Sequence, residues 1–422
     1  MAPITIEPVP ASRRSGLKAE VLILFVLGSL VGYFSTFDIQ GPLANRVKDW
    51  TDRPGVEPLS IALTLAHTGR FADPYGAPTG PSAHMGRVFP MYLAGVLLAV
   101  KSGVARAIAL RLGAALFHGL ELALLPLLSA AVFGEAEIGL AAALLAIVIP
   151  CYAITPLWDS SLDGLATIGF CLAVTRIDAR SRLQMAGLGA FWGLLLLLSP
   201  TLAIPTGVWA FFAARKGRWP LGPIGLAFAM TLVVCLPWTI RNYRVLGGFV
   251  PIRDNFGLEL QVSNNDGARP GIRQNAASLM KFHPSRNPEQ RAEVRQRGEL
   301  RYNQDKMQQA MAWILSHPNR FAVLTFQRVI EYWFPTTVDF PVATVGIWIV
   351  TLLSIPGMIL AAVRRDRAAS PLLWMLALAP LVYYIVESDP RYRTPLLWIS
   401  LLFAGYALHA AIHWRGRSVP AR

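Results

Sequence analysis

Charged residues are scarce in this chain. Asp, Glu, Lys and Arg make up 15% of the 422 residues, whereas 54% are hydrophobic. Because soluble domains carry roughly 25% charged residues, this composition excludes an ordinary soluble fold. The net charge of +14 would suit nucleic acid, but the Lys and Arg residues lie mostly in short clusters between apolar segments, as the positive-inside rule expects. We therefore expect an integral membrane protein that contacts membrane lipids and binds no nucleic acid.

Cysteine is also rare. Cys151, Cys171 and Cys235 lie in or beside apolar segments, which excludes a disulfide framework and indicates packing roles. No Gly-rich phosphate loop is present, which excludes cytoplasmic nucleotide-sugar chemistry. We expect no cofactor. We also expect no metal, because the following histidines show no zinc-like spacing such as His-x-x-x-His: His67, His118, His283, His317 and His413.

What the chain has instead is a series of apolar segments, broken by two long polar stretches at 38–85 and 239–341. Each segment is roughly as long as a helix that crosses a bilayer, and only helices or closed barrels satisfy their backbone polar groups there. We expect an all-α fold, a polytopic transmembrane helical bundle with two large extracytoplasmic loops. The eleven segments are 21–37, 86–100, 107–132, 135–150, 162–175, 185–198, 200–214, 222–238, 342–362, 371–386 and 395–413.

The distribution of basic residues predicts the orientation. Basic residues near both ends, among them Arg13 and Arg417, place both termini in the cytoplasm, which requires an even number of crossings. The segment 86–100 is shorter than the roughly 20 residues of a span, so we expect it to be re-entrant or interfacial and to leave ten crossings. Ser199-Pro200 is expected to break the helix between two short segments.

Three regions follow from this pattern. Residues 1–238 form an N-terminal transmembrane module that includes the first outer loop, 239–341 form a large outer loop, and 342–422 form the last helices. Asn, Gly and Pro at 255–275 predict turns. Apolar residues at helical spacing over 289–333 predict one or two helices on the outer membrane surface, with a break at Pro318.

Acidic residues in the outer stretches are the candidates for chemistry, because ionisable groups near a membrane often mark a site. Glu57 begins an expected helix from Pro58 to Thr68. Proline and an acid at a helix start are also ordinary capping features, so both interpretations stand. Asp159 and Asp163 flank Ser160-Ser161 at the next outer turn, where an Asp before a span can also be a simple cap.

Four stretches carry a resemblance to a known family. They are HTGRFADPYGAPTGPSAHMGRVFPMYLAG (67–95), GLLLLLSPTLAIP (193–205), LPWTIRNYRVLGGFVPIRDNFGLELQVSNNDGA (236–268) and DPRYRTPLLWISLLFAGYAL (389–408). They occur in the same order as, and resemble, segments of bacterial membrane glycosyltransferases of the GT-C superfamily. That superfamily includes the dolichyl-phosphate-mannose protein mannosyltransferases and the lipid A aminoarabinose transferase.

The resemblance implies a GT-C fold and an enzyme of the bacterial inner membrane. Such an enzyme transfers a sugar from a polyprenyl-phosphate donor to a lipid, glycan or protein acceptor at the extracytoplasmic face, with inversion. An acid of the first outer loop serves as the base. Related enzymes often carry Asp-Glu before the first outer helix, whereas this chain has Val56-Glu57. Glu57 alone, Asp52 or Asp49 reaching in, or Asp159 could therefore fill the role.

Arginines at outer span ends are the candidates for binding the lipid phosphate, since guanidinium groups suit phosphate oxygens. Arg391 and Arg393 are the first choice, because the positive-inside rule does not explain positive charge there. Arg87 and His84 come next, and a further pair could line the site, Arg241 and Asn242. Each arginine could instead be an interface anchor that snorkels to lipid headgroups.

Two other functions compete with the transferase. A lipid or small-molecule transporter or flippase would show inverted repeats and charges near the midplane, and we find no internal repeat. A catalytically inactive family member that binds lipid-linked sugar is the other alternative, because Val56 stands where relatives carry an acid.

Overall fold

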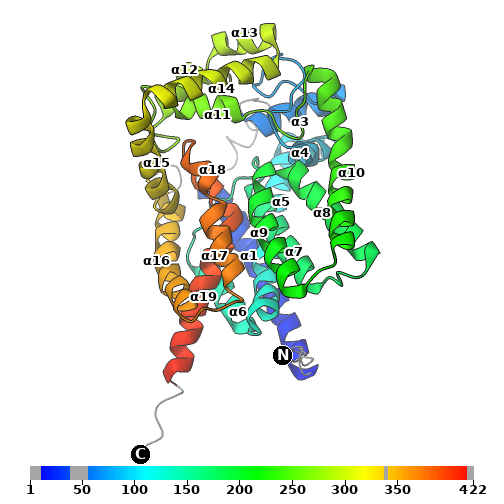
Figure 1. Ribbon diagram of the computed structural model, residues 1–422, viewed down its shortest axis with the longest axis vertical. Coiled ribbons are helices and arrows are strands. Elements are labelled where there is room, and N and C mark those ends of the chain that lie inside the picture. Colours follow the sequence, from blue (N-terminus) through cyan, green and yellow to red (C-terminus); the bar gives the residue numbers. More distant parts are fainter. Residues whose placement is uncertain (1–10, 39–55, 337–340, 416–422) are drawn as a thin grey trace, which may run out of the picture.

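The computed structural model describes residues 11–38, 56–336 and 341–415. Within these ranges the regular secondary structure is helical and includes no strand, only isolated bridges between Ala72 and Pro81 and between Gly271 and Ser388. The expected all-α class is therefore confirmed. The helices form a bundle, and a layer of further helices covers the end of the bundle that is far from both termini (Figure 1).

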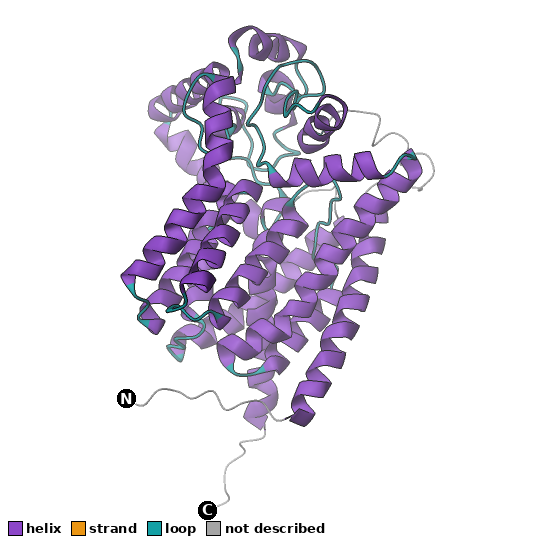
Figure 2. Ribbon diagram, turned by 90° about the vertical axis from the view of Figure 1, so that its right-hand side faces the viewer, coloured by secondary structure: helices purple, strands orange, loops and turns teal. Residues whose placement is uncertain are grey.

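Five long helices form much of the bundle and run roughly parallel to one another (Figure 2). They are α1 (Ala11–Asp38), α5 (Gly103–Phe133), α10 (Leu221–Leu246), α16 (Pro341–Val363) and α19 (Leu397–Arg415). Each contributes a stretch that is long and apolar enough to cross a membrane. Together they indicate a multi-pass membrane protein.

Shorter apolar helices fill the bundle between these five. They are α6 (Ala136–Val148), α7 (Ser160–Arg176), α8 (Arg182–Leu198), α9 (Ala203–Gly217), α17 (Ser370–Leu378) and α18 (Leu381–Tyr384). The expected break falls where it was predicted, since α8 ends at Leu198 and a 3₁₀ turn, η1 (Pro200–Leu202), separates it from α9. Proline has no backbone N–H and cannot continue a helix without losing a hydrogen bond.

The segment expected to cross only partly is α4 (Val88–Ala99), a helix of 12 residues. At 1.5 Å per residue it is about 18 Å long, well short of a hydrocarbon core of about 30 Å. Helix α3 (Glu57–Thr68) packs against it. This length agrees with a segment that enters the membrane without crossing it.

This covering layer, called the outer layer below, comes mostly from the large loop 239–341. It contains α11 (Phe256–Ser263), α12 (Ala276–Phe282), α13 (Pro288–Arg297), α14 (Glu299–Ser316) and α15 (Pro318–Trp333). The helical character predicted over 289–333 and the break at Pro318 are confirmed, but the range holds three helices rather than one or two, because the chain also breaks at Gly298, whose φ is 80°. The prediction of turns was wrong for 256–263. There, Leu258 and Val262 are fully buried in a cluster with Tyr302, and this burial outweighs the turn preference of the flanking Asn and Gly.

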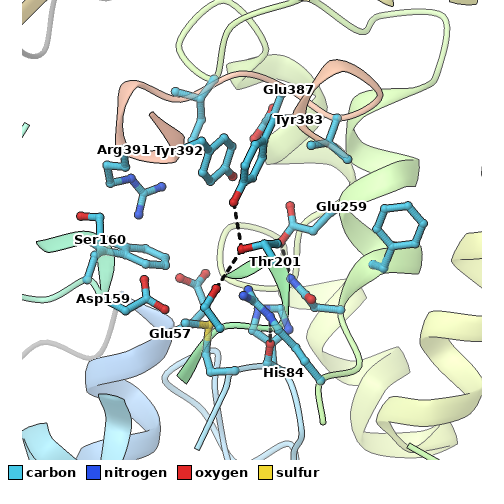
Figure 3. Close-up of a pocket in the computed structure, with 18 of the residues that line it drawn as sticks. Glu57, His84, Asp159, Ser160, Thr201, Glu259, Tyr383, Glu387, Arg391 and Tyr392 are labelled. Carbon is cyan, nitrogen blue, oxygen red and sulfur yellow. Dashed lines mark hydrogen bonds between the residues drawn. The ribbon is translucent and has the colours of Figure 1, made fainter. Parts of the chain in front are cut away.

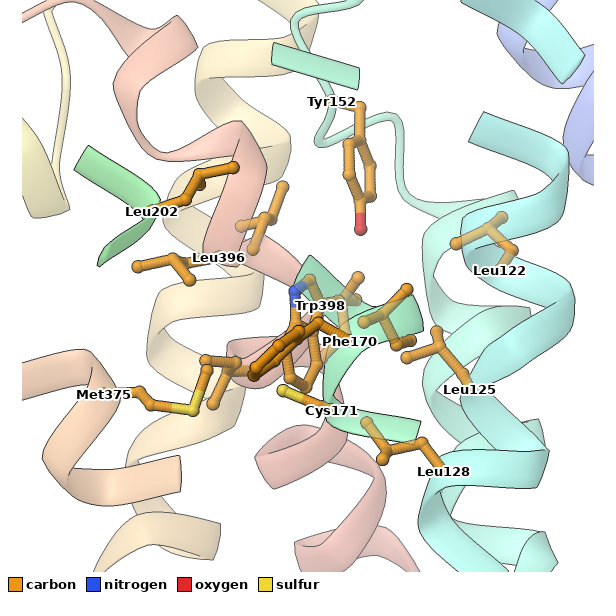
Figure 4. Packing of buried hydrophobic residues seen from close by; sticks show 14 of the residues in the cluster. Leu122, Leu125, Leu128, Tyr152, Phe170, Cys171, Leu202, Met375, Leu396 and Trp398 are labelled. Carbon is orange, nitrogen blue, oxygen red and sulfur yellow. The ribbon is translucent and has the colours of Figure 1, made fainter. Parts of the chain in front are cut away.

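Helix α7 occupies the middle of the bundle. Its Phe170 and Cys171 are fully buried, and Trp398 of α19 packs in the same cluster (Figure 4). The beginning of α7 and two short turns that precede α19, η2 (Pro390–Tyr392) and η3 (Thr394–Leu396), are thereby fixed beneath the outer layer.

Candidate functional site

A cavity of about 510 Å³ lies between the helical bundle and the outer layer. Its walls come from the start of α3, the turn before α7, the 3₁₀ turn η1, helix α11 and the segment 382–395 (Figure 3). These pieces are far apart in the sequence, so the cavity exists only in the folded chain.

Glu57 is the first residue of α3 and its carboxylate points into the cavity (Figure 3). Its side chain is largely buried, and its Oε1 lies 4.0 Å from Nε2 of His283. Val56, the residue before the helix, also lines the cavity and caps no backbone N–H with its side chain. Asp52 and Asp49, the alternative acids of this loop, lie outside the described residues.

Asp159 and Asp163 line the same cavity. The Asp159 side chain accepts no hydrogen bond from the first turn of α7, so the structure does not support the capping interpretation for this residue. Burial raises the pKa of Asp159, while Arg253 and Arg391 pull it down. The Asp159 carboxyl group is therefore a second acid of the cavity, and two arginines favour its charged form.

Arg391 is held in place on two sides. Its Nε and one terminal nitrogen donate to the same oxygen of Asp389 at 2.9 and 2.8 Å, and its guanidinium lies 3.8 Å from the centre of the Trp158 ring. The guanidinium points toward the cavity, on the side of Ser160 and Asp159 (Figure 3). A cation fixed in this way is suited to bind an anionic ligand group.

The structure does not bring Arg393 to the cavity. The side chain is buried and donates to the Trp333 carbonyl at 2.8 Å, to Thr351 Oγ1 at 2.6 Å and to Ser400 Oγ at 3.2 Å. These partners belong to α15, α16 and α19, so Arg393 ties three helices together.

Three other predicted residues lie outside the cavity lining and make contacts within the protein. Arg241 donates to the carbonyls of Ser82 and Phe71, both at 2.6 Å. Asn242 donates to the Val250 carbonyl at 3.1 Å, and Arg87 contacts Met91 and lies over the Trp238 ring at 5.5 Å. His84, in contrast, does line the cavity.

Several lining residues were missed by the sequence analysis. They are Arg253, Glu259, His283, Arg286, Tyr383, Glu387 and Tyr392. Glu387 could have been found, because it stands at the outer end of an apolar segment, as Arg391 does. Tyr392 stands between the two predicted arginines, Arg391 and Arg393, but carries no charge that marks it. The others lie in the large loop or inside an apolar segment, where no local spacing marks them.

Glu387 is a buried acid on the wall opposite Glu57. Burial raises its pKa to about 8, and Asn275 donates to its Oε2 at 2.5 Å. Nearby, the rings of Tyr383 and Tyr392 are stacked with their centres 4.6 Å apart. Tyr383 in turn donates to Thr201 at 3.1 Å. This wall therefore offers aromatic faces and a buried carboxyl group whose pKa is raised.

His84, Glu259 and His283 offer ligand atoms that all lie within 4.8 Å of one another. The Nδ1 atoms of His84 and His283 contact Tyr75 Oη at 3.2 Å and Ser285 Oγ at 2.6 Å, which leaves both Nε2 atoms for a ligand. Burial lowers the pKa of His84 and keeps its imidazole neutral, as a metal ligand must be. Two imidazoles and one carboxylate form a donor set that suits a divalent cation such as zinc.

The prediction that no metal binds relied on spacing along the chain. Spacing could not reveal this group, because its members come from both outer loops. One His-x-x-x-His pair escaped that argument, His409 and His413 of α19, whose ring centres are 4.1 Å apart. It lies near the opposite end of the bundle and lines a separate groove with Arg364 and Asp366.

Comparison with known proteins gave matches among solved structures alone: no family model and no curated protein matches the sequence. The oligosaccharyltransferase AglB of Archaeoglobus fulgidus, in complex with an inhibitory peptide and a dolichol-phosphate, is similar with a TM-score of 0.55 and 16% identity over 95% of this chain and 52% of that chain. The oligosaccharyltransferase of this organism in complex with Zn and sulfate gives 0.54 and 17%, over 93% and 50%. ArnT of Cupriavidus metallidurans, bound to undecaprenyl phosphate, gives 0.40 and 14%, over 92% and 78%.

The chain thus spans about half the length of the oligosaccharyltransferases that it matches. At these identities the likeness shows the fold alone, a helical fold like that of the Archaeoglobus fulgidus oligosaccharyltransferase. The fold that the sequence resemblance implied is confirmed.

Proposed function

We propose that this chain is a membrane glycosyltransferase that takes a sugar from a polyprenyl-phosphate carrier and passes it to an acceptor at the extracytoplasmic face. The observation that carries the proposal is the meeting of Glu57, Asp159 and Arg391 in one cavity at the outer end of the bundle. A carboxylate and a fixed cation are the two groups that glycosyl transfer from a phosphate requires.

In this mechanism Glu57 is the general base. It accepts the proton of an acceptor hydroxyl as the hydroxyl oxygen forms a bond to the anomeric carbon of the sugar. The bond between that carbon and the phosphate oxygen breaks on the opposite side, so the configuration inverts. The electron pair leaves with the polyprenyl phosphate. Asp159 is another acid that lines the same cavity.

Arg391 offsets the negative charge that grows on the departing phosphate. Stabilising developing charge with preorganised groups is usually the largest catalytic contribution, and the contacts of Arg391 with Asp389 and Trp158 orient it before the donor binds. Arg253 and Arg286 also line the cavity and would add to the positive field.

A divalent cation would be held by His84, Glu259 and His283, whose geometry fits one. Bound there, it would supply further positive charge within the cavity. The proposed roles of Glu57 and Arg391 do not depend on it.

The test is transfer of radiolabelled sugar by the purified protein in lipid vesicles, with a panel of polyprenyl-phosphate sugars beside the matching nucleotide sugars. We expect transfer from at least one lipid-linked donor and none from the nucleotide sugars. Folded protein that moves labelled lipid across the vesicle membrane, but transfers no sugar from any donor, would contradict the proposal and favour a flippase.

A further inference from the structure

A fully buried carboxyl group lies in the bundle below the cavity, outside the site described above. Glu121 is in the middle of α5 and has no solvent exposure. A carboxyl group at membrane depth is costly and calls for a specific role. Its two oxygens contact two different pieces of the chain, and both pieces lead to the cavity.

The first contact is with the segment that precedes α7. Tyr152 donates its hydroxyl to Oε1 of Glu121 at 2.9 Å, and its ring lies 4.4 Å from the ring of His118, one turn earlier in α5. The Tyr152 hydroxyl points down into the bundle (Figure 4). Six residues later the same segment supplies Trp158, on which Arg391 stacks, and then Asp159.

The second contact is with the first turn of α7. A Cβ atom added at Gly164 would lie 2.7 Å from Oε2 of Glu121 and 3.0 Å from its Cδ, so the carboxyl group rests directly against the helix backbone. Asp163, the residue before Gly164, lines the cavity. Among the described residues, Oε2 has no hydrogen-bond partner. Its position is therefore set by its close approach to the backbone, which glycine at position 164 permits.

We propose that Glu121 is a positioning residue that fixes the Trp158–Asp163 turn against α5 and so sets where Asp159 stands in the cavity. It acts through Tyr152 on one side and through the Gly164 backbone on the other, and it touches no substrate. The inference rests on the proposed function for its kinetic readout, but its structural readout is independent of any activity.

The test begins with a pair of glycine variants on the same helix. Gly164→Ala puts a methyl group against the Glu121 carboxyl group, whereas at Gly169 an added Cβ would make an ordinary contact of 3.8 Å with Phe191. We expect Gly164→Ala to lower kcat by about ten- to a hundredfold, as small misplacements of catalytic groups do, with little change in the KM for the donor. Gly169→Ala should behave as the wild type. Equal effects of the two variants would overturn the proposal.

Substitutions of Glu121, alone and together with Gly164→Ala, form a double-mutant cycle. Glu121→Gln keeps the shape and the acceptor oxygen and should retain activity, whereas Glu121→Ala should lose it as Gly164→Ala does. In the Glu121→Ala background the Gly164→Ala change should cost nothing more, since the methyl group then has room. Loss of activity in Glu121→Gln as complete as in Glu121→Ala, or fully additive effects of the double variant, would contradict a positioning role.

Hydrogen exchange gives the readout that needs no substrate. In Glu121→Ala, exchange should speed up over residues 153–163 and stay unchanged in α10 and α16. Faster exchange throughout the bundle would show a general loss of stability and would overturn the proposal. If the wild type transfers no sugar, the proposed function fails, and the exchange pattern still decides the role of Glu121.

Discussion

Arg391 and Arg393 are two residues apart and have different surroundings. Arg391 lines the cavity, whereas Arg393 is buried among Trp333, Thr351 and Ser400. We predict that Arg391→Gln weakens binding of undecaprenyl phosphate by about ten- to a hundredfold, the worth of hydrogen bonds to a charged group, with little change in Tm. Arg393→Gln should instead lower the Tm and leave the affinity nearly unchanged. Calorimetric titration and thermal denaturation of both variants measure this, and the reverse pattern would contradict the assignment.

The donor set of His84, Glu259 and His283 predicts that the protein retains a divalent metal. Elemental analysis of protein purified without chelator should find zinc, and His283→Ala should lose most of it, because removing one of three ligands typically costs a site much of its affinity. His317→Ala is the matched control, since His317 is exposed and stacks on Trp313 away from the cavity. Equal metal contents in the wild type and in His283→Ala would refute this site.

At the scale of elements, the start of α14 holds the first outer loop through a buried acid. Glu299 Oε1 accepts the Ala83 N–H at 2.6 Å, and burial raises the pKa of Glu299 to about 8. Because the folded state then holds the proton more tightly than the unfolded chain, the contribution of Glu299 to stability is full below its ordinary pKa of 4.5 and is lost as the pH rises through about 8.

Glu299→Gln should therefore flatten the decline of Tm between pH 4.5 and about pH 8, since the amide keeps the acceptor oxygen and carries no charge. Glu289→Gln, at an exposed position in α13, should leave the decline as it is. If Tm depends on pH in the same way in Glu299→Gln and in the wild type, the pKa of Glu299 is not raised in the folded protein.

Helix α15 presents its apolar side outward and its charged side inward. Val323, Phe326 and Ile330 are exposed, Phe326 by 66%. Arg328 is buried and donates to the carbonyl of Ile385 at 3.1 Å and to Asn264 Oδ1 at 3.2 Å. This arrangement predicts that the outward face lies in the lipid rather than in water.

Cysteine labelling tests this placement with little background, because Cys151, Cys171 and Cys235 are all buried. A cysteine placed at Phe326 should react several-fold more slowly with a membrane-impermeant maleimide than one placed at Gln309, an exposed position on α14. The difference should disappear in mild detergent with a small, permeant reagent. Equal rates in lipid vesicles would place α15 in water.

The sequence predicted the helices well and their burial poorly. Long apolar runs and the prolines at 200 and 318 predicted the ends of α8, the start of α15 and the break between α8 and α9 nearly as observed, because these signals are local. The start of α14 at Glu299 was not predicted. Helix α11 was missed because its burial against α14 decides its structure. The direction of Arg393 could not be known either, since two of its three partners, Trp333 and Thr351, lie 60 and 42 residues away.

At the scale of the whole molecule, the difference between local signals and long-range contacts also decides which site residues could be predicted from the sequence. Asp159, Arg391 and His84 could be picked out because an ionisable residue beside an apolar segment is unusual. Glu57 could be picked out because it begins an expected helix in the first polar stretch. Glu259 and His283 belong to a polar loop in which such residues are ordinary, and only the folding of that loop over the bundle brings them to the cavity.

The most direct measurement of the central claim is sugar transfer from a lipid-linked donor by Glu57→Gln beside the wild type, with Glu289→Gln as the control. The amide keeps the size of the side chain and removes its basicity. We predict that kcat falls by about a hundred- to ten-thousandfold, the usual contribution of a general base, while binding of polyprenyl phosphate and the Tm stay near the wild-type values. A Glu57→Gln protein that transfers sugar at the wild-type rate would contradict the account and move the base to another acid of the cavity.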